Sequence, residues 1–167
     1  MNDVSAMHAL SERLCPWLGP ALEHFETARA AQRLGHAWLL TGPQGVGKIN
    51  LALVLAGRLL GTPATGTPPE LDAQTFAAAM RARHAPADHH PDLHWIYPQE
   101  DKRTISVEQV REITDVLSLK AHRAAAKVVV IEPADGMTDA AANALLKTLE
   151  EPVGDAYLLL VSHQAGR

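Results

Sequence analysis

A glycine-rich segment that ends in a lysine, residues 42–48, holds the residue types that bind phosphate. Gly42 and Gly47 enclose four residues, and Lys48 follows directly, which is the spacing of a phosphate-binding loop, or P-loop. Glycines let consecutive backbone N–H groups turn inward around an anion, and a helix that starts here adds its positive end. The segment predicts a phosphate cradle formed by Gly42, Gly45, Gly47 and Lys48.

Position 49 departs from the P-loop pattern. A working loop carries a serine or threonine there, whose hydroxyl ligates Mg²⁺, whereas Ile49 offers only hydrocarbon. Backbone groups and Lys48 would remain to hold phosphate. The sequence therefore leaves open whether nucleotide still binds, and we expect weak binding of ATP and Mg²⁺ at most.

The acidic part of a P-loop enzyme is expected at the end of a neighbouring buried strand, and residues 127–131 supply such a strand. Glu132 follows it and stands where an acidic residue would hold Mg²⁺ through water. The next position needs a carboxylate that orients the attacking water, but it is Pro133. We interpret Asp135 as a solvated turn residue and not as a displaced catalytic base. Because phosphoryl transfer depends on positioning and charge, we predict no catalytic residue and no hydrolysis.

Strands and helices alternate around these residues. We expect strands at 36–40, 93–97, 127–131 and 157–161, and helices at 48–60, from Ser106 onward and after Thr138. Ser106 and Gln109 fit a capping box, and Thr138 is a good N-cap. The helix after Thr138 has a predicted buried stripe of Ala142, Leu145, Leu146 and Leu149. This alternation predicts an α/β fold in three layers, with a mostly parallel sheet covered on both faces.

Composition limits the remaining possibilities. The 167 residues carry a net charge of −4, 47% hydrophobic residues and one cysteine. This predicts one domain over residues 1–167, with a linker-like insertion at about 61–91. No apolar run is long enough to span a bilayer, and no export signal is visible, so we expect a cytoplasmic protein. The three tryptophans are predicted to pack in the core or at an interface, at positions 17, 38 and 95.

Metal binding is a separate question. Cys15 has no partner for a disulfide or a cysteine zinc site. His84, His89, His90 and His94 would be possible zinc ligands. However, a stretch of mixed alanine, proline, aspartate and histidine is more typical of a solvated connection, so zinc binding is not expected.

Residues 143–152, Asn-Ala-Leu-Leu-Lys-Thr-Leu-Glu-Glu-Pro, together with the strand before them, resemble a signature of bacterial DNA polymerase III clamp-loader subunits. Residues 15–18, 90–92 and 105–111 are similar to the delta-prime subunits of that family in particular. The resemblance covers about residues 15–163. It implies the AAA+ fold and membership of a pentameric ring that places the sliding clamp on primed DNA.

Within that family, the altered residues at 49 and 133 imply an ATPase-deficient subunit of the DNA polymerase III holoenzyme. The implied partners are the delta and gamma/tau subunits and, through the assembled loader, the clamp and primed DNA. An ATP-hydrolysing motor subunit or another P-loop ATPase remains the alternative. We expect the last strand, the lid and collar domains and the family's trans-acting arginine to lie beyond residue 167. Asn143 and Lys147 either are solvated or face a ring neighbour or DNA.

Overall fold

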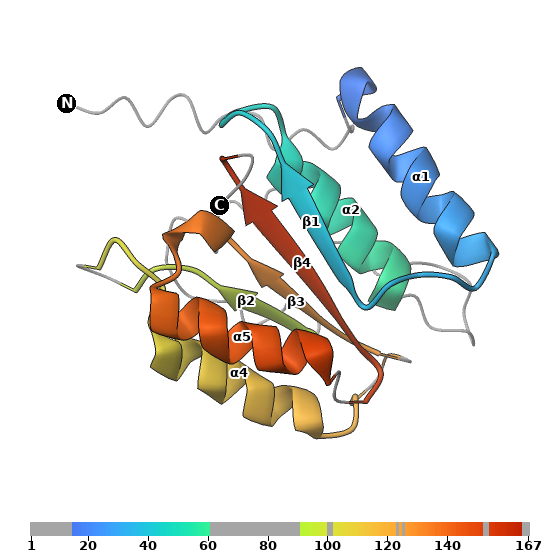
Figure 1. The fold of residues 1–167 in the computed structure, drawn as a ribbon. Coiled ribbons are helices and arrows are strands. Elements are labelled where there is room, and N and C mark those ends of the chain that lie inside the picture. Colours follow the sequence, from blue (N-terminus) through green and yellow to red (C-terminus); the bar gives the residue numbers. More distant parts are fainter. Residues whose placement is uncertain are drawn as a thin grey trace.

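The computed structural model describes residues 15–60, 91–99, 102–122, 124, 126–151 and 154–164. Four parallel strands form one sheet in the order β1-β4-β3-β2 (Figure 1). Their bounds are β1 Ala37–Thr41, β2 Leu93–Ile96, β3 Lys127–Ile131 and β4 Ala156–Ser162. The helices are η2 Pro16–Leu18, α1 Gly19–Ala30, α2 Lys48–Leu60, α4 Val107–Ser118, η3 Ala134–Gly136 and α5 Asp139–Glu150.

Helices cover the sheet from both sides, which confirms the predicted three-layer α/β architecture. One apolar cluster joins α1 and α2 to the sheet, with Phe25 and Leu55 packed near Val128 and Val130. The second joins α4 and α5 to the opposite sheet face, through side chains such as Val129. Successive residues of β3 thus enter different clusters, as the alternation of side chains along a strand requires. Burial on both faces explains the continuous apolar sequence of this strand.

The predicted helix starts are confirmed by their caps. The Ser106 hydroxyl accepts from the Gln109 backbone N–H, and the Gln109 side chain accepts from the Ser106 N–H. Thr138 accepts from the N–H of Ala141 at the start of α5. Each cap satisfies backbone donors that the first helical turn leaves unpaired.

The predicted apolar stripe of α5 was wrong at Leu146, whose side chain is 53% exposed. The buried residues of this helix are Ala141, Leu145 and Thr148. This face turns toward α4, where the hydroxyl groups of Thr148 and Thr114 lie 3.2 Å apart. The pairing with α4 rotates Leu146 outward, an influence that periodicity within one helix does not contain.

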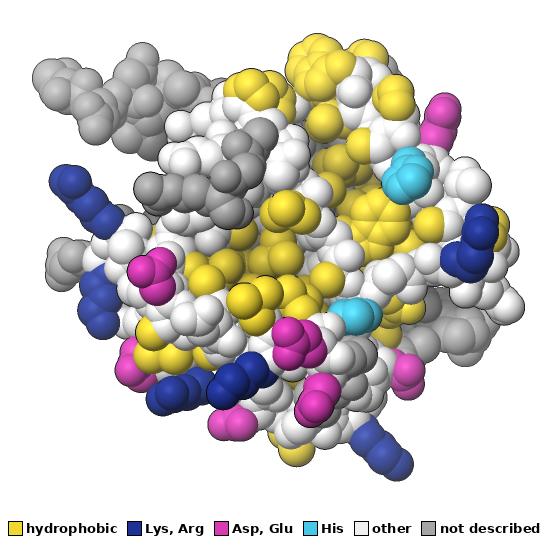
Figure 2. All heavy atoms as spheres, viewed as in Figure 1, with side chains coloured by type: hydrophobic (Ala, Val, Ile, Leu, Met, Phe, Trp, Pro, Cys, Tyr) yellow, Lys and Arg dark blue, Asp and Glu magenta, His cyan; other side chains and the backbone are white. Residues whose placement is uncertain are grey.

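Strand β1 is an edge strand in the described part of the chain, and its covering is incomplete. Leu39 is 59% exposed there. Figure 2 shows apolar side chains gathered over β1, between α5 and α1. Both faces of the sheet are therefore covered at β3 and β4, while Leu39 of β1 is left exposed.

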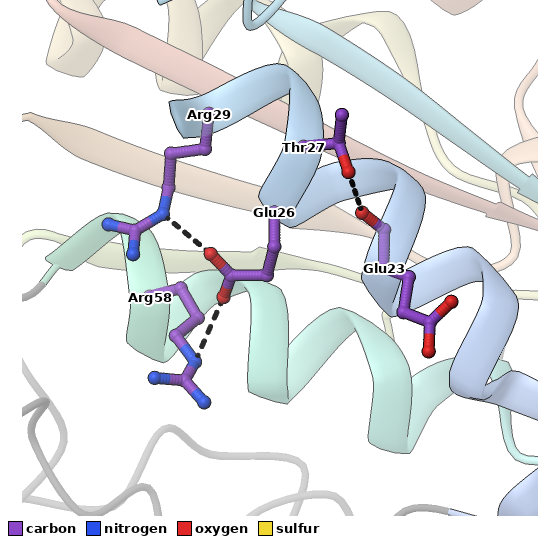
Figure 3. A network of polar contacts seen from close by, with 5 residues as sticks. All are labelled: Glu23, Glu26, Thr27, Arg29 and Arg58. Carbon is purple, nitrogen blue, oxygen red and sulfur yellow. Dashed lines mark hydrogen bonds and ion pairs between the residues drawn. The ribbon is translucent and has the colours of Figure 1, made fainter. Parts of the chain in front are cut away.

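Helix α1 is fastened to α2 by polar and apolar contacts. Glu26 forms ion pairs with Arg29 of its own helix, at 2.9 Å, and with Arg58 of α2, at 3.2 Å (Figure 3). Phe25 of the same helix is fully buried, with its ring centroid 5.1 Å from that of Trp38. Because exposed ion pairs contribute at most about 1 kcal/mol, the buried ring is the stronger attachment.

Several expectations fall on residues outside the description. These are most of the insertion, including the histidines at 84, 89 and 90. Within the described ranges, no three histidine, cysteine, aspartate or glutamate side chains are grouped to hold a metal ion. No helix among the same residues has the length and apolar character needed to cross a bilayer.

Candidate nucleotide site

The phosphate cradle lies at the carboxyl end of β1, where the chain turns into α2. Gly42, Gly45 and Gly47 have φ angles of 148°, 85° and 89°. Residues other than glycine rarely adopt these backbone angles, so the path of the loop requires glycine at the three positions. The structure confirms the predicted sequence of strand, glycine loop and helix, and Lys48 is the first residue of α2.

The Lys48 side chain folds back onto its own loop. Its ammonium group donates to the carbonyl oxygens of Gly42, at 2.7 Å, and Pro43, at 2.6 Å. The residue is only 5% exposed. Desolvation lowers the pKa of Lys48, while the negative charges of Glu132 and Asp135 act in the opposite direction. A phosphate group would have to draw this ammonium away from both carbonyls.

Glu132 lies directly after β3, and its backbone N–H donates to the carbonyl of Ile96 at 3.0 Å. Burial raises the pKa of Glu132 to about 7, and the nearby charge of Lys48 offsets only part of that effect. A divalent cation bound beside this carboxyl group would lower its pKa again, so the raised pKa describes the site without metal.

Asp135 lies in the single turn η3 and is partly exposed, as the interpretation of a turn residue expects, but it also makes a structural contact. Its carboxylate accepts from the backbone N–H of His163 at 2.9 Å, which ties η3 to the end of β4. Burial acts to raise the pKa of Asp135, but the hydrogen bonds it accepts hold the pKa below the ordinary value. Ser162, also at the end of β4, exchanges hydrogen bonds with the backbone of Gln164. The sequence held no signal for this connection because it joins residues 28 apart.

Trp17 is 65% exposed, so core packing was the wrong prediction for this residue, whereas packing at an interface stays a prediction. Its indole N–H donates to the carbonyl of Val46 in the phosphate loop at 2.9 Å. Trp38 and Trp95, by contrast, pack against the apolar cluster beneath α2. Sequence reasoning therefore missed a contact to the loop, although Pro16 at the start of η2 marks a turn at this point.

The residues present do not fit a magnesium nucleotide. Ile49 is half-buried and packs against the apolar cluster that contains Leu51 and Leu55. It therefore places hydrocarbon where a metal ligand would stand. Pro133 carries no carboxylate that could orient an attacking water. What remains is a backbone cradle and one buried ammonium group, which suit a phosphate anion without metal.

Comparison with known proteins identifies the family of this chain. A family model described as "DNA polymerase III, delta subunit" matches residues 18–167. This chain belongs to that family. The DNA polymerase III subunit delta' of Pseudomonas aeruginosa is 43% identical over 134 residues, which cover 79% of this chain and 38% of that protein. The corresponding subunit of Escherichia coli K12 is 35% identical over 155 residues, covering 93% and 45%.

The fold is also found in a solved structure. A DNA polymerase III gamma subunit-related protein from Thermotoga maritima superposes with a TM-score of 0.58 at 24% identity. The match covers 83% of this chain and 38% of the other. This likeness concerns the fold alone. The chain spans less than half the length of the two delta' relatives.

Proposed function

We propose that this chain is the nucleotide-binding-like domain of an ATPase-deficient clamp-loader subunit. In this role it acts in the cytoplasm with delta and gamma/tau subunits, and helps load the sliding clamp onto primed DNA during replication. Contacts to the clamp and to DNA are made through the assembled complex. Residues 1–167 form one AAA+ domain in this proposal, with an insertion at about 61–91. The two delta' relatives support it, because each matches most of this chain.

The observation that carries the ATPase deficiency is the combined chemistry of Ile49 and Pro133. One position has lost the hydroxyl ligand, and the other has lost the water-orienting carboxylate. Removing one electrostatic contribution to a transition state typically costs a factor of about 10²–10³ in rate. Two such losses leave no useful turnover. Gly42, Gly45, Gly47 and Lys48 then hold phosphate weakly, without a catalytic role.

The test measures phosphate release by the full-length protein with Mg²⁺-ATP, alone and after assembly with delta and gamma subunits. We expect no turnover by the isolated protein, and clamp loading only when it is present in the assembly. Lys48→Ala should leave clamp loading unchanged when the gamma subunits supply hydrolysis. Steady phosphate release by the isolated protein, lost in Lys48→Ala, would contradict the proposal and favour a motor subunit.

Restoring one lost group provides a second test. Ile49→Thr returns a hydroxyl to the loop but leaves Pro133 in place. We expect this variant to gain Mg²⁺-dependent binding of a fluorescent ATP analogue without gaining hydrolysis. Hydrolysis by Ile49→Thr alone would show that the residues after β3 are sufficient, which the proposal excludes.

A further inference from the structure

Residues 15–18, which we call the 15–18 turn, contact the phosphate loop through three side chains. Trp17 donates to the Val46 carbonyl, as described above. Leu18 and Cys15 lie against Gly47, where an added Cβ would come 3.2 Å from Leu18 Cδ1 and 3.6 Å from Cys15 Sγ. The turn is closed by the Leu18 N–H, which donates to the Cys15 carbonyl at 2.9 Å.

The 15–18 turn is itself held in place by the helix that continues from it. Leu18 is buried in the apolar cluster beneath α2, together with Phe25 of α1. The Glu26–Arg58 ion pair joins α1 to α2 further along (Figure 3). The turn and α1 are therefore both attached to α2, which is the helix that follows the phosphate loop.

We infer that Trp17 is a positioning residue for the phosphate loop, which keeps its cradle shape through the 15–18 turn and without a bound nucleotide. The C=O and N–H groups of a trans peptide point in opposite directions. The hydrogen bond to the Val46 carbonyl thus directs the Gly47 N–H away from Trp17. Gly47 is held from the same side by Leu18 and Cys15. This role does not depend on whether the loop binds ATP.

The first experiment compares Trp17→Phe with Trp38→Phe in the full chain. Each substitution removes one indole N–H that donates to a backbone carbonyl. The Trp38 indole donates to the carbonyl of Gly35 at 3.1 Å, away from the phosphate loop, so Trp38→Phe is the matched control. The measurement is amide hydrogen exchange at the start of α2, where the Leu51 N–H donates to the Gly47 carbonyl at 3.1 Å. Loss of the neutral hydrogen bond between Trp17 and Val46 should increase exchange there by about two- to tenfold in Trp17→Phe. Trp38→Phe should leave these amides unchanged while affecting stability, because its ring packs on Phe25.

Alkylation of Cys15 by N-ethylmaleimide gives an independent measurement. Cys15 is the only cysteine of the sequence, and the modification is quantified on the peptide that contains it. Because Cys15 is half-buried against Gly47, release of the turn should expose its thiol. We expect Trp17→Phe to accelerate alkylation by a factor similar to that for hydrogen exchange.

A matched pair of glycine substitutions separates the contact with the turn from strain in the loop. Gly45 and Gly47 have nearly equal positive φ angles, so alanine strains the backbone at either site. Only at Gly47 would the new methyl group meet the turn, since nothing lies within 4 Å of a Cβ at Gly45. We expect the two variants to have similar melting temperatures. Alkylation of Cys15 should nevertheless be faster in Gly47→Ala than in Gly45→Ala.

Three results would overturn the inference. The first is equal exchange at the start of α2 in Trp17→Phe and Trp38→Phe, and the second is equal Cys15 alkylation in Gly45→Ala and Gly47→Ala. The third is an increase of exchange throughout α4 and α5 in Trp17→Phe as large as that at the start of α2, because the role of Trp17 would then be general stability and not positioning. ATP turnover and clamp loading enter none of these measurements, so their outcome and that of the proposed function are separate.

Discussion

Glu132→Gln should make the protein more stable at alkaline pH, and the gain should grow between about pH 4.5 and 7. The folded-state pKa of Glu132 is raised to about 7 by burial, from an ordinary value of 4.5. The folded protein therefore binds the Glu132 proton more tightly than the unfolded chain does. Glu132 therefore has no effect on the free energy of unfolding below its unfolded-state pKa. That free energy falls as the pH rises between the two pKa values, and it stays reduced above the folded-state pKa.

The magnitude follows from the separation of the two pKa values. At about 1.4 kcal/mol per pH unit, the ionised carboxylate costs the folded state up to about 3 kcal/mol above pH 7. Glutamine keeps the shape of the protonated side chain and does not titrate. For a chain of this length, 3 kcal/mol corresponds to roughly 6–12 °C in melting temperature.

The assay is urea unfolding of the full chain and of Glu132→Gln at several values between pH 5 and 8.5. The difference in unfolding free energy isolates Glu132, because all other groups titrate in both proteins. Lys48→Met serves as the coupling control. Since the Lys48 charge favours the ionised carboxylate, its removal should raise the folded-state pKa of Glu132 and extend the pH-dependent window at its upper end. A free-energy difference that stays constant from pH 5 to 8.5 would refute the reasoning.

Three further substitutions test the contacts that hold the fold around the site. Asp92 is fully buried and accepts from the backbone N–H groups of His122 and Ala124, so Asp92→Ala should cost about 2–4 kcal/mol in urea unfolding, against little for the exposed Asp115→Ala. Thr138→Ala removes the N-cap of α5 and should lower the unfolding free energy by about 1 kcal/mol, with Thr138→Ser retaining most of it. Buried Lys127 donates to the Val116 carbonyl at 2.6 Å, so Lys127→Met should destabilise by about 1–3 kcal/mol and increase hydrogen exchange at the end of α4. A neutral result in any of the three would show that water replaces the contact without loss.

The elements that position the site could be predicted from the sequence because their signals are local. The helix from Lys48 to Leu60 and the caps at Ser106 and Thr138 depend on residues within a few positions of one another. The β3 strand, although it includes the buried Lys127, is recognisable from four consecutive apolar residues. The parallel order of the sheet then follows from the helical crossovers between strands.

The contacts that decide the chemistry of the site could not be predicted in this way. The raised pKa of Glu132 arises from burial at the carboxyl end of β3, and the role of Asp135 arises from a backbone group 28 residues away. Trp17 reaches Val46 across 29 residues. Leu146 shows the same limit in reverse, because its position in an apolar pattern did not reveal that α4 covers the neighbouring face. The cradle could be recognised from neighbouring residues in the sequence, whereas the contacts that support it join residues far apart in the sequence.

A phosphate loop that has lost its metal ligands still requires particular residues at several positions, for reasons of backbone geometry. Gly42, Gly45 and Gly47 adopt φ angles that other residues reach only with strain of about 1–3 kcal/mol each. The Lys48 ammonium group donates hydrogen bonds to the carbonyls of Gly42 and Pro43, which ties the start of the loop to the start of α2. Replacing any of these groups therefore carries a cost in folding, whether or not a nucleotide is bound. Ile49 carries no such cost, because its side chain simply joins the apolar cluster, and this is the position at which the catalytic pattern is lost.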